Sequence, residues 1–262
     1  MTRLAILSDV HGNLIALDAV LHDVETRGGA DAYWVLGDLA ALGYDPAGAL
    51  ARLASLPNAR VVRGNTDRYL VTGDRPPDAP SLAAAQADPA QLSKLVEVEQ
   101  SFTWAQGYLA GGWLDWLAAL PADERLTLPD GTRLLGVHAS PGHDDGPGLG
   151  PPAGDETLAS RLHGCVAGVV AAGHTHRPMD RTVTTNSGPV RIVNVGSVSN
   201  PSGDDLRASY ALLDAGPAGY EIALHRVAYD VDAVVAAIAR SRMPALPAAW
   251  LLKRHFTRAG AQ

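Results

Sequence analysis

Residues 4–13 read LAILSDVHGN, and this stretch decides the expected fold. A short apolar run, residues 4–7, meets polar residues at once, and Asp9 and His11 follow it. A run of this length that ends at turn residues is typical of a buried strand. The apolar residues at 14, 17, 20, 21 and 24 keep helical spacing, and Gly28-Gly29 ends the pattern. The chain therefore opens with a strand, a polar loop and a helix.

Five more short apolar runs are expected to form buried strands, at residues 33–36, 60–62, 134–137, 169–172 and 192–195. Two hairpins are also expected. Residues 125–128 and 133–137 flank the turn Pro129-Asp130-Gly131-Thr132, and residues 209–214 and 220–227 flank a turn at 216–219. The hairpins thus come late in the chain.

Helices are expected between these strands. Asp45-Pro46 and Asp88-Pro89 each offer an N-cap residue followed by proline at the first helical position. A tryptophan-rich stretch at 104–116 and two late segments, 230–243 and 247–256, also have helical patterns, whereas 72–87 and 142–155 look like loops. Alternating strands and helices followed by hairpins predict an α/β sandwich of mixed sheets with helices outside.

Composition excludes several classes of protein. The chain has 262 residues, 47% of them hydrophobic, and 21 basic against 28 acidic residues give a net charge of −7. This balance does not favour duplex nucleic acid, which requires a basic face. The single cysteine, Cys165, allows no intrachain disulfide and favours a reducing, cytoplasmic compartment. No apolar stretch has the length of a membrane span or a signal peptide.

Seven polar side chains follow the expected strands closely, where ligands gather in α/β folds. They are Asp9, His11, Asp38, Asn65, His138, His174 and His176. Carboxylate, amide and imidazole ligands together suit Mn²⁺, Zn²⁺, Fe or Ni²⁺ better than Ca²⁺. Seven such groups are too many for one ion and suit two ions that share a bridging carboxylate.

These residues lie in sequence blocks that resemble the calcineurin-like metallophosphoesterases. The blocks are Asp9-Val10-His11-Gly12-Asn13, Gly37-Asp38, Gly64-Asn65-Thr66-Asp67, Val137-His138-Ala139 and Gly173-His174-Thr175-His176, with a later Asn194-Val195-Gly196-Ser197. The resemblance runs from residue 4 to about residue 200. It implies a four-layer αββα sandwich of two mixed β-sheets flanked by helices, in a single domain over 1–262 with a helical insertion at about 70–125.

The resemblance also implies how two divalent cations are held. Asp9, His11 and His176 would bind the first, and Asn65, His138 and His174 the second, with Asp38 bridging both. Mn²⁺ is the expected metal, and Fe, Zn, Ni or Mg are alternatives. A hydroxide that bridges the metals would attack phosphorus in line, with Asp38, Asn65 and His138 as catalytic residues.

One position departs from the family pattern. The commoner block reads Gly-Asn-His followed by Asp or Glu, and its histidine protonates the leaving group, whereas this chain has Thr66. A threonine hydroxyl cannot carry a proton at neutral pH as imidazole does. The chain thus resembles the small prokaryotic, phosphodiesterase-like branch that lacks this histidine. His143, in the glycine-rich loop after His138, is a further candidate for the proton donor.

Other residues near the blocks have two interpretations. Asn13 can contact phosphate or only cap the first helix, and Thr66 and Arg177 are expected to contact substrate. Asp67 is expected to support its loop. The tryptophan-rich stretch is either core or a stacking platform for bases. Residues 246–252, which are apolar, can dock on the domain or on a second subunit, so a homo-oligomer is possible.

The sequence thus predicts a metal-dependent phosphoesterase, with phosphodiesters favoured over phosphomonoesters and a small phosphorylated molecule or nucleotide as substrate. Two alternatives stay open. One is a non-catalytic interaction module that keeps the metallophosphoesterase fold. The other is a nuclease that acts on single-stranded ends, although the chain lacks the clustered Lys/Arg run that a basic groove requires.

Overall fold

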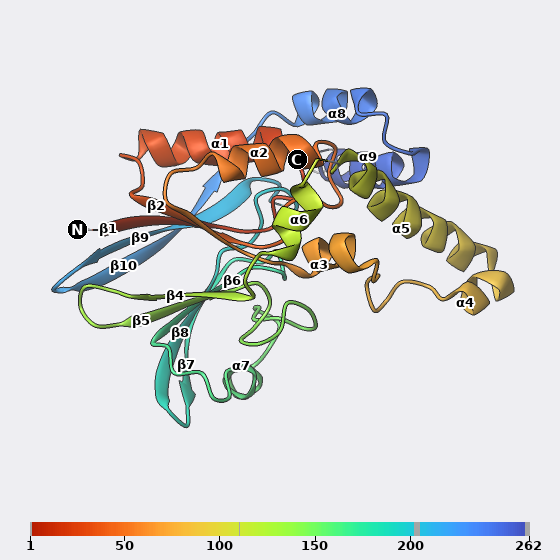
Figure 1. Cartoon of the computed structure of the whole chain (residues 1–262). Helices are drawn as coiled ribbons and strands as arrows, with labels where there is room; N and C mark the ends of the chain where they lie inside the picture. Colours follow the sequence, from red (N-terminus) through yellow and green to blue (C-terminus); the bar gives the residue numbers. More distant parts are fainter. Residues whose placement is uncertain (1, 110, 202–204, 260–262) are drawn as a thin grey trace.

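The computed structural model describes residues 2–109, 111–201 and 205–259 and arranges them as two five-stranded sheets with helices outside (Figure 1). The first sheet has the order β10-β9-β1-β2-β3. Strands β1, β2 and β3 are parallel, and β9 and β10 add an antiparallel hairpin. The bounds are β1 Thr2–Leu7, β2 Ala32–Leu36, β3 Ala59–Val62, β9 Ala208–Gly216 and β10 Gly219–Val227.

The second sheet has the order β4-β5-β6-β8-β7. Its central strands β5, β6 and β8 are parallel, and the edge strands β4 and β7 are antiparallel to their neighbours. The bounds are β4 Asp123–Thr127, β5 Arg133–Val137, β6 Val169–Ala172, β7 Met179–Thr185 and β8 Gly188–Asn194. Both sheets are therefore mixed, as predicted.

The alternation of side chains along β1 shows how the layers form. Leu4 and Ile6 point into a core between the two sheets, where they join Trp34 of β2 and Val169 of β6. Ala5 and the other alternate residues face the opposite side and pack under the helices α1 (Leu14–Thr26) and α2 (Pro46–Ala54). Successive side chains of a strand point to opposite faces, so one strand serves two cores.

A third core lies on the outer face of the second sheet, where Val170 and Ile192 pack against Leu158 and Leu162. Leu158 belongs to α7 (Asp155–Arg161), a short helix that covers this face (Figure 1). The layers are thus helix, sheet, sheet and helix. The predicted four-layer αββα sandwich is confirmed.

Caps explain where the first helices begin. The side chain of Asn13 accepts a 3.1 Å hydrogen bond from the backbone N–H of Ala16, and Asp45 accepts one of 2.9 Å from Gly48. Such caps satisfy donors that have no partner within the helix. Both expected hairpins are also present, as β4–β5 and β9–β10.

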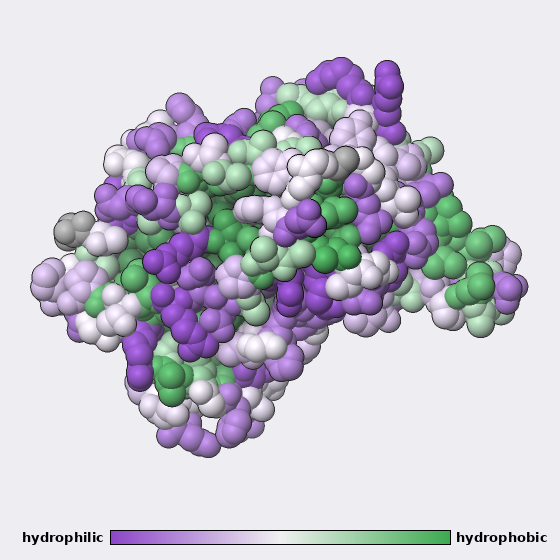
Figure 2. All heavy atoms as spheres, viewed as in Figure 1, coloured by the Kyte–Doolittle hydropathy of each residue, from purple (hydrophilic) through white to green (hydrophobic). Residues whose placement is uncertain are grey.

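Helices α3 (Asn65–Thr72), α4 (Leu82–Ala87), α5 (Pro89–Tyr108) and α6 (Trp113–Ala118) lie between β3 and β4. The tryptophan-rich stretch divides between α5 and α6, and Trp104, Trp113 and Trp116 pack partly buried against the core beneath α1 and α2. The expectation of a loop over the whole of 72–87 is wrong, because α4 occupies its end. Hydrophobic side chains gather where α4 and α5 meet (Figure 2), and Leu82 and Leu92 are exposed there.

The C-terminal helices α8 (Val231–Arg240) and α9 (Ala245–Ala259) pack against the same chain. Leu251 of α9 is buried in a cluster with Val234, Ile238 and Tyr44, the last of which precedes α2. The apolar stretch at 246–252 thus docks on its own chain through Leu251, and the homo-oligomer stays a prediction. Within the described ranges, no helix has both the length and the apolar character needed to cross a bilayer.

Candidate metal centre

The predicted ligands meet at one edge of the sandwich, where strands from both sheets end. Asp9 and Asp38 lie just after β1 and β2, and Asn65 opens α3 after β3. From the second sheet, His138 directly follows β5, and His174 follows β6 with His176 close behind. All seven side chains are buried or half-buried, and Asp9, Asp38 and His138 are at most 3% exposed.

The imidazoles form two close pairs. Nε2 of His11 lies 3.3 Å from Nε2 of His176, and Nε2 of His138 lies 3.3 Å from Nδ1 of His174. Two imidazole nitrogens that approach this closely either share a proton or direct their lone pairs at a common cation. Asn65 lies at the second pair, with its Oδ1 3.0 Å from His138 and 3.1 Å from His174.

Backbone carbonyls fix the orientation of every one of these four rings. Nδ1 of His11, His138 and His176 faces the carbonyl oxygens of Ala41 (3.1 Å), Leu36 (2.6 Å) and Asn200 (2.7 Å). Nε2 of His174 faces the carbonyl of Gly146 at 2.7 Å. A ring nitrogen can donate to a carbonyl only as N–H, so the other nitrogen of each neutral ring keeps its lone pair toward the centre.

The carboxylate of Asp38 lies between the two imidazole pairs. Its Oδ2 is 3.7 Å from Nε2 of His11, and its Oδ1 is 3.5 Å from Nε2 of His138. Oδ1 of Asp9 is 3.0 Å from Nε2 of His176 and 3.8 Å from Nε2 of His11. The Asp38 carboxylate thus faces both imidazole pairs, and Oδ1 of Asp9 lies nearest to His176.

Charge coupling shifts the pKa values of these groups. Burial raises the pKa of the Asp38 carboxyl, but the surrounding imidazoles, His138 first among them, together lower it more, and the net pKa is below the ordinary value. Burial lowers the pKa of His138, yet Asp38, Asp9 and the Leu36 carbonyl together outweigh this effect and raise the pKa to about 10. Burial also lowers the pKa of His176, but the nearby carboxylates, Asp9 first among them, raise it, and the net pKa is above the ordinary value. The buried carboxylates thus require positive charge beside them, which protons or a cation can supply.

Backbone strain also concentrates here. Five of the seven residues have left-handed backbone conformations, with φ between 46° and 64°: Asp9, His11, Asp38, His174 and His176. A non-glycine residue in this region costs roughly 1–2 kcal/mol. Strain of this kind persists where the surrounding structure holds it for function.

Gly37 allows the loops after β2 and β3 to approach each other. Its φ is 85°, and a Cβ atom there would lie 2.5 Å from the backbone nitrogen of Gly64 and 2.8 Å from Nδ1 of His138. No side chain fits this space, so glycine lets Asp38 and Asn65 reach the same centre.

The donor set fits divalent metal ions. Two groups of side chains bring their ligand atoms within 4.8 Å of one another, Asp9 with His11 and His176, and Asp9 with Asp38 and His138. The first group equals the predicted first set. The second group contains Asp38 and His138 of the predicted second set together with Asp9. Imidazole and carboxylate ligands together suit first-row transition metals.

Comparison with known proteins agrees with this geometry. A sequence model described as the calcineurin-like phosphoesterase superfamily domain matches residues 2–216. The chain belongs to the calcineurin-like phosphoesterase superfamily. An uncharacterized protein of Methanocaldococcus jannaschii is 27% identical over 97% of this chain and 98% of its own length.

Two solved structures share the fold over 96% of this chain and 98% of their own chains. A metallophosphoesterase from Sphaerobacter thermophilus is 25% identical with a TM-score of 0.71, and a hypothetical protein from Pyrococcus horikoshii OT3 is 21% identical with a TM-score of 0.76. A symmetrical bis(5'-nucleosyl)-tetraphosphatase of Citrobacter koseri is 37% identical, but the match covers only 32% of this chain and 33% of that protein.

The remaining predicted residues of this calcineurin-like chain have different surroundings. Oδ1 of Asn13 caps α1 and also accepts a 3.2 Å hydrogen bond from the Tyr44 hydroxyl, while its Nδ2 is buried without a partner. The backbone N–H of Thr66 donates to Oδ1 of Asp38 at 2.9 Å, and its hydroxyl is buried without a partner. His143 is exposed, and only its backbone pairs, with Ser140. Its role as proton donor stays a prediction.

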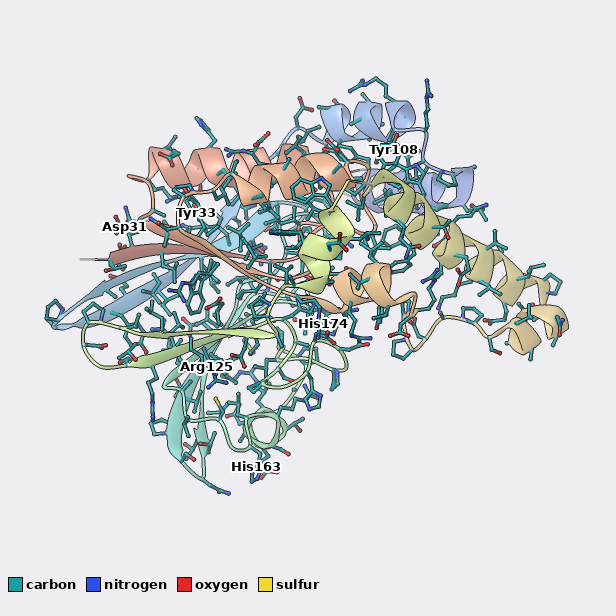
Figure 3. All side chains as sticks on the ribbon, in the orientation of Figure 1. Asp31, Tyr33, Tyr108, Arg125, His163 and His174 are labelled. Atoms are coloured by element: carbon teal, nitrogen blue, oxygen red, sulfur yellow. The ribbon has the colours of Figure 1, made fainter. Side chains whose placement is uncertain are left out.

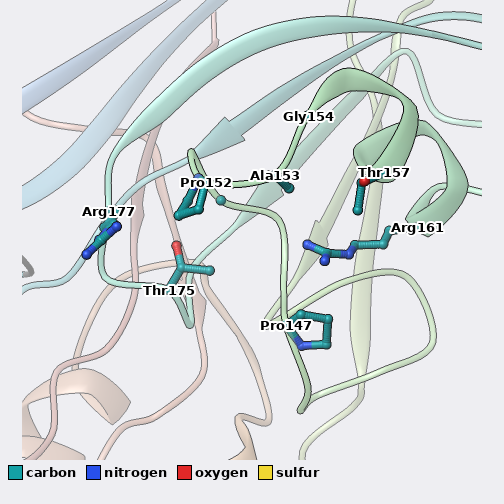
Figure 4. Close-up of a pocket in the computed structure, with 9 residues that line it drawn as sticks. Pro147, Pro152, Ala153, Gly154, Thr157, Arg161, Thr175 and Arg177 are labelled. Atoms are coloured by element: carbon teal, nitrogen blue, oxygen red, sulfur yellow. The ribbon is translucent and has the colours of Figure 1, made fainter.

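Arg177 lines a cavity of about 610 Å³ next to the centre, together with Thr175 and Arg161 (Figure 4). Thr175 and Arg177 flank His176 in the chain, so this calcineurin-like centre has a basic cavity at its edge. His163, which no block contains, lies apart from His174 beside α7 (Figure 3).

Sequence reasoning missed several supports of the centre. Asp144 pairs with Arg63 and Arg68, and Asp145 accepts from the Tyr69 hydroxyl, which fixes the loop that presents the Gly146 carbonyl to His174. The charges of Asp144 and Asp145 were visible in the sequence, but nothing indicated their partners. The carbonyls that orient the imidazoles have no sequence signal at all.

Proposed function

We propose that this chain is a dinuclear-metal-dependent phosphoesterase that hydrolyses phosphodiesters of small or nucleotide substrates. The observation that carries the proposal is the arrangement of two imidazole pairs, each 3.3 Å apart, on either side of the Asp38 carboxylate. In each pair, the two imidazole nitrogens can direct their lone pairs at one cation. The Asp38 carboxylate turns one oxygen toward each pair. Membership of the superfamily supports phosphoester hydrolysis.

In this proposal Asp9, His11 and His176 hold one ion, Asn65, His138 and His174 hold the other, and Asp38 contacts both. Bound divalent ions, with Mn²⁺ as the expected pair, would activate water and neutralise charge on the phosphate oxygens. The residues of the chain would hold these ligand side chains in fixed orientations. Carbonyl contacts hold the imidazoles in one tautomer, and the left-handed loops hold Asp9 and Asp38 at fixed directions.

Three further residues would position the substrate. Nδ2 of Asn13 is a buried donor without a partner beside His11, and it can donate to a phosphate oxygen. Arg177 supplies positive charge from the adjoining cavity, and Thr66 lies against Asp38. Because Thr66 replaces the histidine of the commoner block, substrates with good leaving groups are favoured.

The nucleotide class rests on a partial likeness. The relative in Citrobacter koseri is a symmetrical bis(5'-nucleosyl)-tetraphosphatase, and a nucleotide substrate is proposed for this chain on that likeness.

We also propose that the whole chain acts as one domain, with 70–125 as its insertion. The single buried cysteine, Cys165, would reflect a reducing cytoplasmic compartment.

The test is hydrolysis of p-nitrophenyl phosphate and bis-p-nitrophenyl phosphate after chelation and reloading with Mn²⁺. Wild type is compared with Asp38→Asn, His138→Ala and Asp115→Asn, the last a control on the exposed surface of α6. We expect metal-dependent cleavage of the diester that the first two variants lose and the control retains. Cleavage of the monoester alone would overturn the diester preference, and no cleavage with any first-row metal would favour a non-catalytic module.

A further inference from the structure

A second cavity opens beside the candidate metal centre. Its volume is about 170 Å³, and its lining comes from four parts of the chain, which include Leu42, Thr66, Phe102 and Trp250. These are the loop before α2, the start of α3, the segment from residue 76 through α5, and the C-terminal helix α9. None of the seven candidate ligands lines it.

One wall of this cavity is continuous with the metal centre. Thr66 follows Asn65, and its backbone N–H donates to Oδ1 of Asp38 at 2.9 Å. Leu42 follows Ala41, whose carbonyl oxygen lies 3.1 Å from Nδ1 of His11. The cavity and the centre therefore adjoin through these two backbone segments.

The cavity wall is mainly apolar and partly aromatic. Phe102 and Trp250 contribute rings, and Leu42 and Val98 contribute aliphatic surface. Asp78 and Lys94, which are exposed and paired at 3.2 Å, are also among the lining residues. Pockets for whole drug-sized ligands are about 300–1,000 Å³, so this smaller volume suits a single ring system.

Two local features mark the wall as more than a packing gap. Leu42 has a left-handed backbone with φ of 71°, which a leucine rarely adopts. The hydroxyl of Thr66 is buried without a hydrogen-bond partner, which costs free energy until a ligand supplies one. Strain and an unpaired donor on one wall are expected where a ligand completes the structure.

We infer that this cavity receives a planar heteroaromatic ring of nucleobase size, carried by the phosphoester whose phosphate lies at the metal centre. The inference rests on the proposed function and names its substrate class. Pro247 and Trp250 lie outside residues 2–216, the part that the superfamily model matches. Substrate choice would thus come from a C-terminal helix added to a shared catalytic core.

A heteroaromatic ring suits this cavity better than an alkyl chain. Aromatic side chains stack favourably on the faces of nucleobases, and Phe102 and Trp250 offer such faces. Glu97 and Ser101 add a carboxylate and a hydroxyl to the wall, which can pair with ring N–H and ring nitrogen atoms. Burial raises the pKa of Glu97, in agreement with a carboxyl that is partly removed from water.

The test compares two diesters with the same leaving group, thymidine 5'-p-nitrophenyl phosphate and methyl p-nitrophenyl phosphate, on the Mn²⁺-loaded full chain. Because the bond broken is the same, the ratio of kcat/KM reports recognition of the nucleoside. We expect a preference of about tenfold or more for the nucleoside ester, the scale of one stacked base. Val98→Phe, which fills the cavity, should bring the ratio to about one while methyl ester cleavage is kept. Leu92→Ala, at an exposed position of the same helix, should leave the ratio unchanged.

A binding measurement separates this inference from the proposed function. Saturation-transfer NMR with adenosine on the metal-free chain should show contact with the base protons that Val98→Phe and Trp250→Ala remove and Leu92→Ala retains. Cleavage of both esters at equal efficiency would overturn the inference and leave the phosphodiesterase standing. If neither ester is cleaved, the proposed function fails, and the adenosine signal alone then decides whether the cavity binds a base. Absence of that signal, or its survival in Val98→Phe, would overturn the inference.

Discussion

The carboxylate of Asp67 accepts a 2.8 Å hydrogen bond from the backbone N–H of Asp38, although the two residues are 29 positions apart. It also accepts from Leu39 and Gly64, both at 2.9 Å. One buried side chain thus holds the loop after β2 against the start of α3. Asp38 and Asn65, on these two segments, keep their separation through this contact.

Replacing Asp67 by asparagine should therefore weaken metal binding without removing a ligand. The amide keeps the size of the carboxylate, but its NH₂ group faces backbone N–H donors where an acceptor is needed. Loss of such an outer support typically costs about 10–100-fold in metal affinity, and we expect Asp67→Asn to fall in this range. Calorimetric titration of the chelated protein with Mn²⁺ measures it. Asp115→Asn, which removes the same charge on the surface, should bind as wild type, and an equal affinity in both variants would contradict the role of Asp67.

Thr66→His should change the dependence of the rate on the leaving group. Thr66 lines the 170 Å³ cavity, so a larger side chain has space there. A positioned proton donor speeds expulsion of a poor leaving group by roughly 10²–10⁴-fold, and an introduced histidine should reach about the lower end of this range. Methyl phenyl phosphate, which has the poorer leaving group, should be cleaved faster, whereas methyl p-nitrophenyl phosphate should not. Neither ester carries a base, so filling the cavity does not enter this comparison.

The matched control for this change is Thr66→Gln, which has a similar size and no titratable proton. If glutamine and histidine raise cleavage of methyl phenyl phosphate equally, the gain comes from packing rather than proton transfer. A bell-shaped pH profile that appears only in the histidine variant would identify the imidazole as the donor.

The strands could be predicted where an apolar run met a polar turn, because buried central strands need apolar residues on both faces. Strand β7 could not, since only Met179 and Val183 are buried in it and its other residues are polar. Helix α4 is not evident from the sequence because Pro76, Pro77 and Pro80 make the whole stretch resemble a loop. The Ser81 hydroxyl oxygen nevertheless caps the helix by accepting a 3.1 Å hydrogen bond from the backbone N–H of Ala84.

The metal ligands could be predicted from the sequence, but the groups that orient them could not. Asp, His and Asn at strand ends carry their chemistry in the residue type, so His138 and His174 were recognisable from sequence. The groups that orient them are backbone carbonyls of Leu36 and Gly146, and any residue type supplies those. The cavity beside Thr66 was equally out of reach, because it depends on how α9 packs against α5, and packing has no local pattern.

The metal-free protein should lose stability as pH rises above neutral. The pKa of His138 is raised to about 10 and that of His176 is also raised, so the folded chain holds these protons more tightly than the unfolded chain. Their stabilising effect is complete below about 6.5, the ordinary histidine value, and is lost as pH approaches about 10. Thermal unfolding of the chelated protein between pH 7 and 9.5 should show a falling Tm.

Two comparisons check the cause of this slope. His138→Gln, which cannot be charged, should lose most of the dependence on pH while keeping a donor for the Leu36 carbonyl. With saturating Mn²⁺ the slope should decrease or reverse, since protons compete with metal for the same nitrogen atoms. A Tm of the chelated wild type that is constant or rises over this window would contradict the assigned coupling between His138 and Asp38.

Arg177→Ala should raise KM far more than it lowers kcat. Arg177 is exposed, follows the ligand His176 and lines the basic cavity, so its charge acts on a bound phosphate rather than on the metals. A hydrogen bond to a charged group contributes about 1.5–3 kcal/mol when well formed, and exposure reduces this, so we expect roughly a tenfold rise in KM for bis-p-nitrophenyl phosphate.

Steady-state kinetics at two salt concentrations measures this rise in KM, and the difference between wild type and variant should shrink at high salt. Arg177→Lys should recover part of the affinity, and Arg240→Ala on α8 should have no effect. An unchanged KM with a reduced kcat would instead mean that Arg177 binds the transition state, because only an interaction made there lowers kcat without changing ground-state binding.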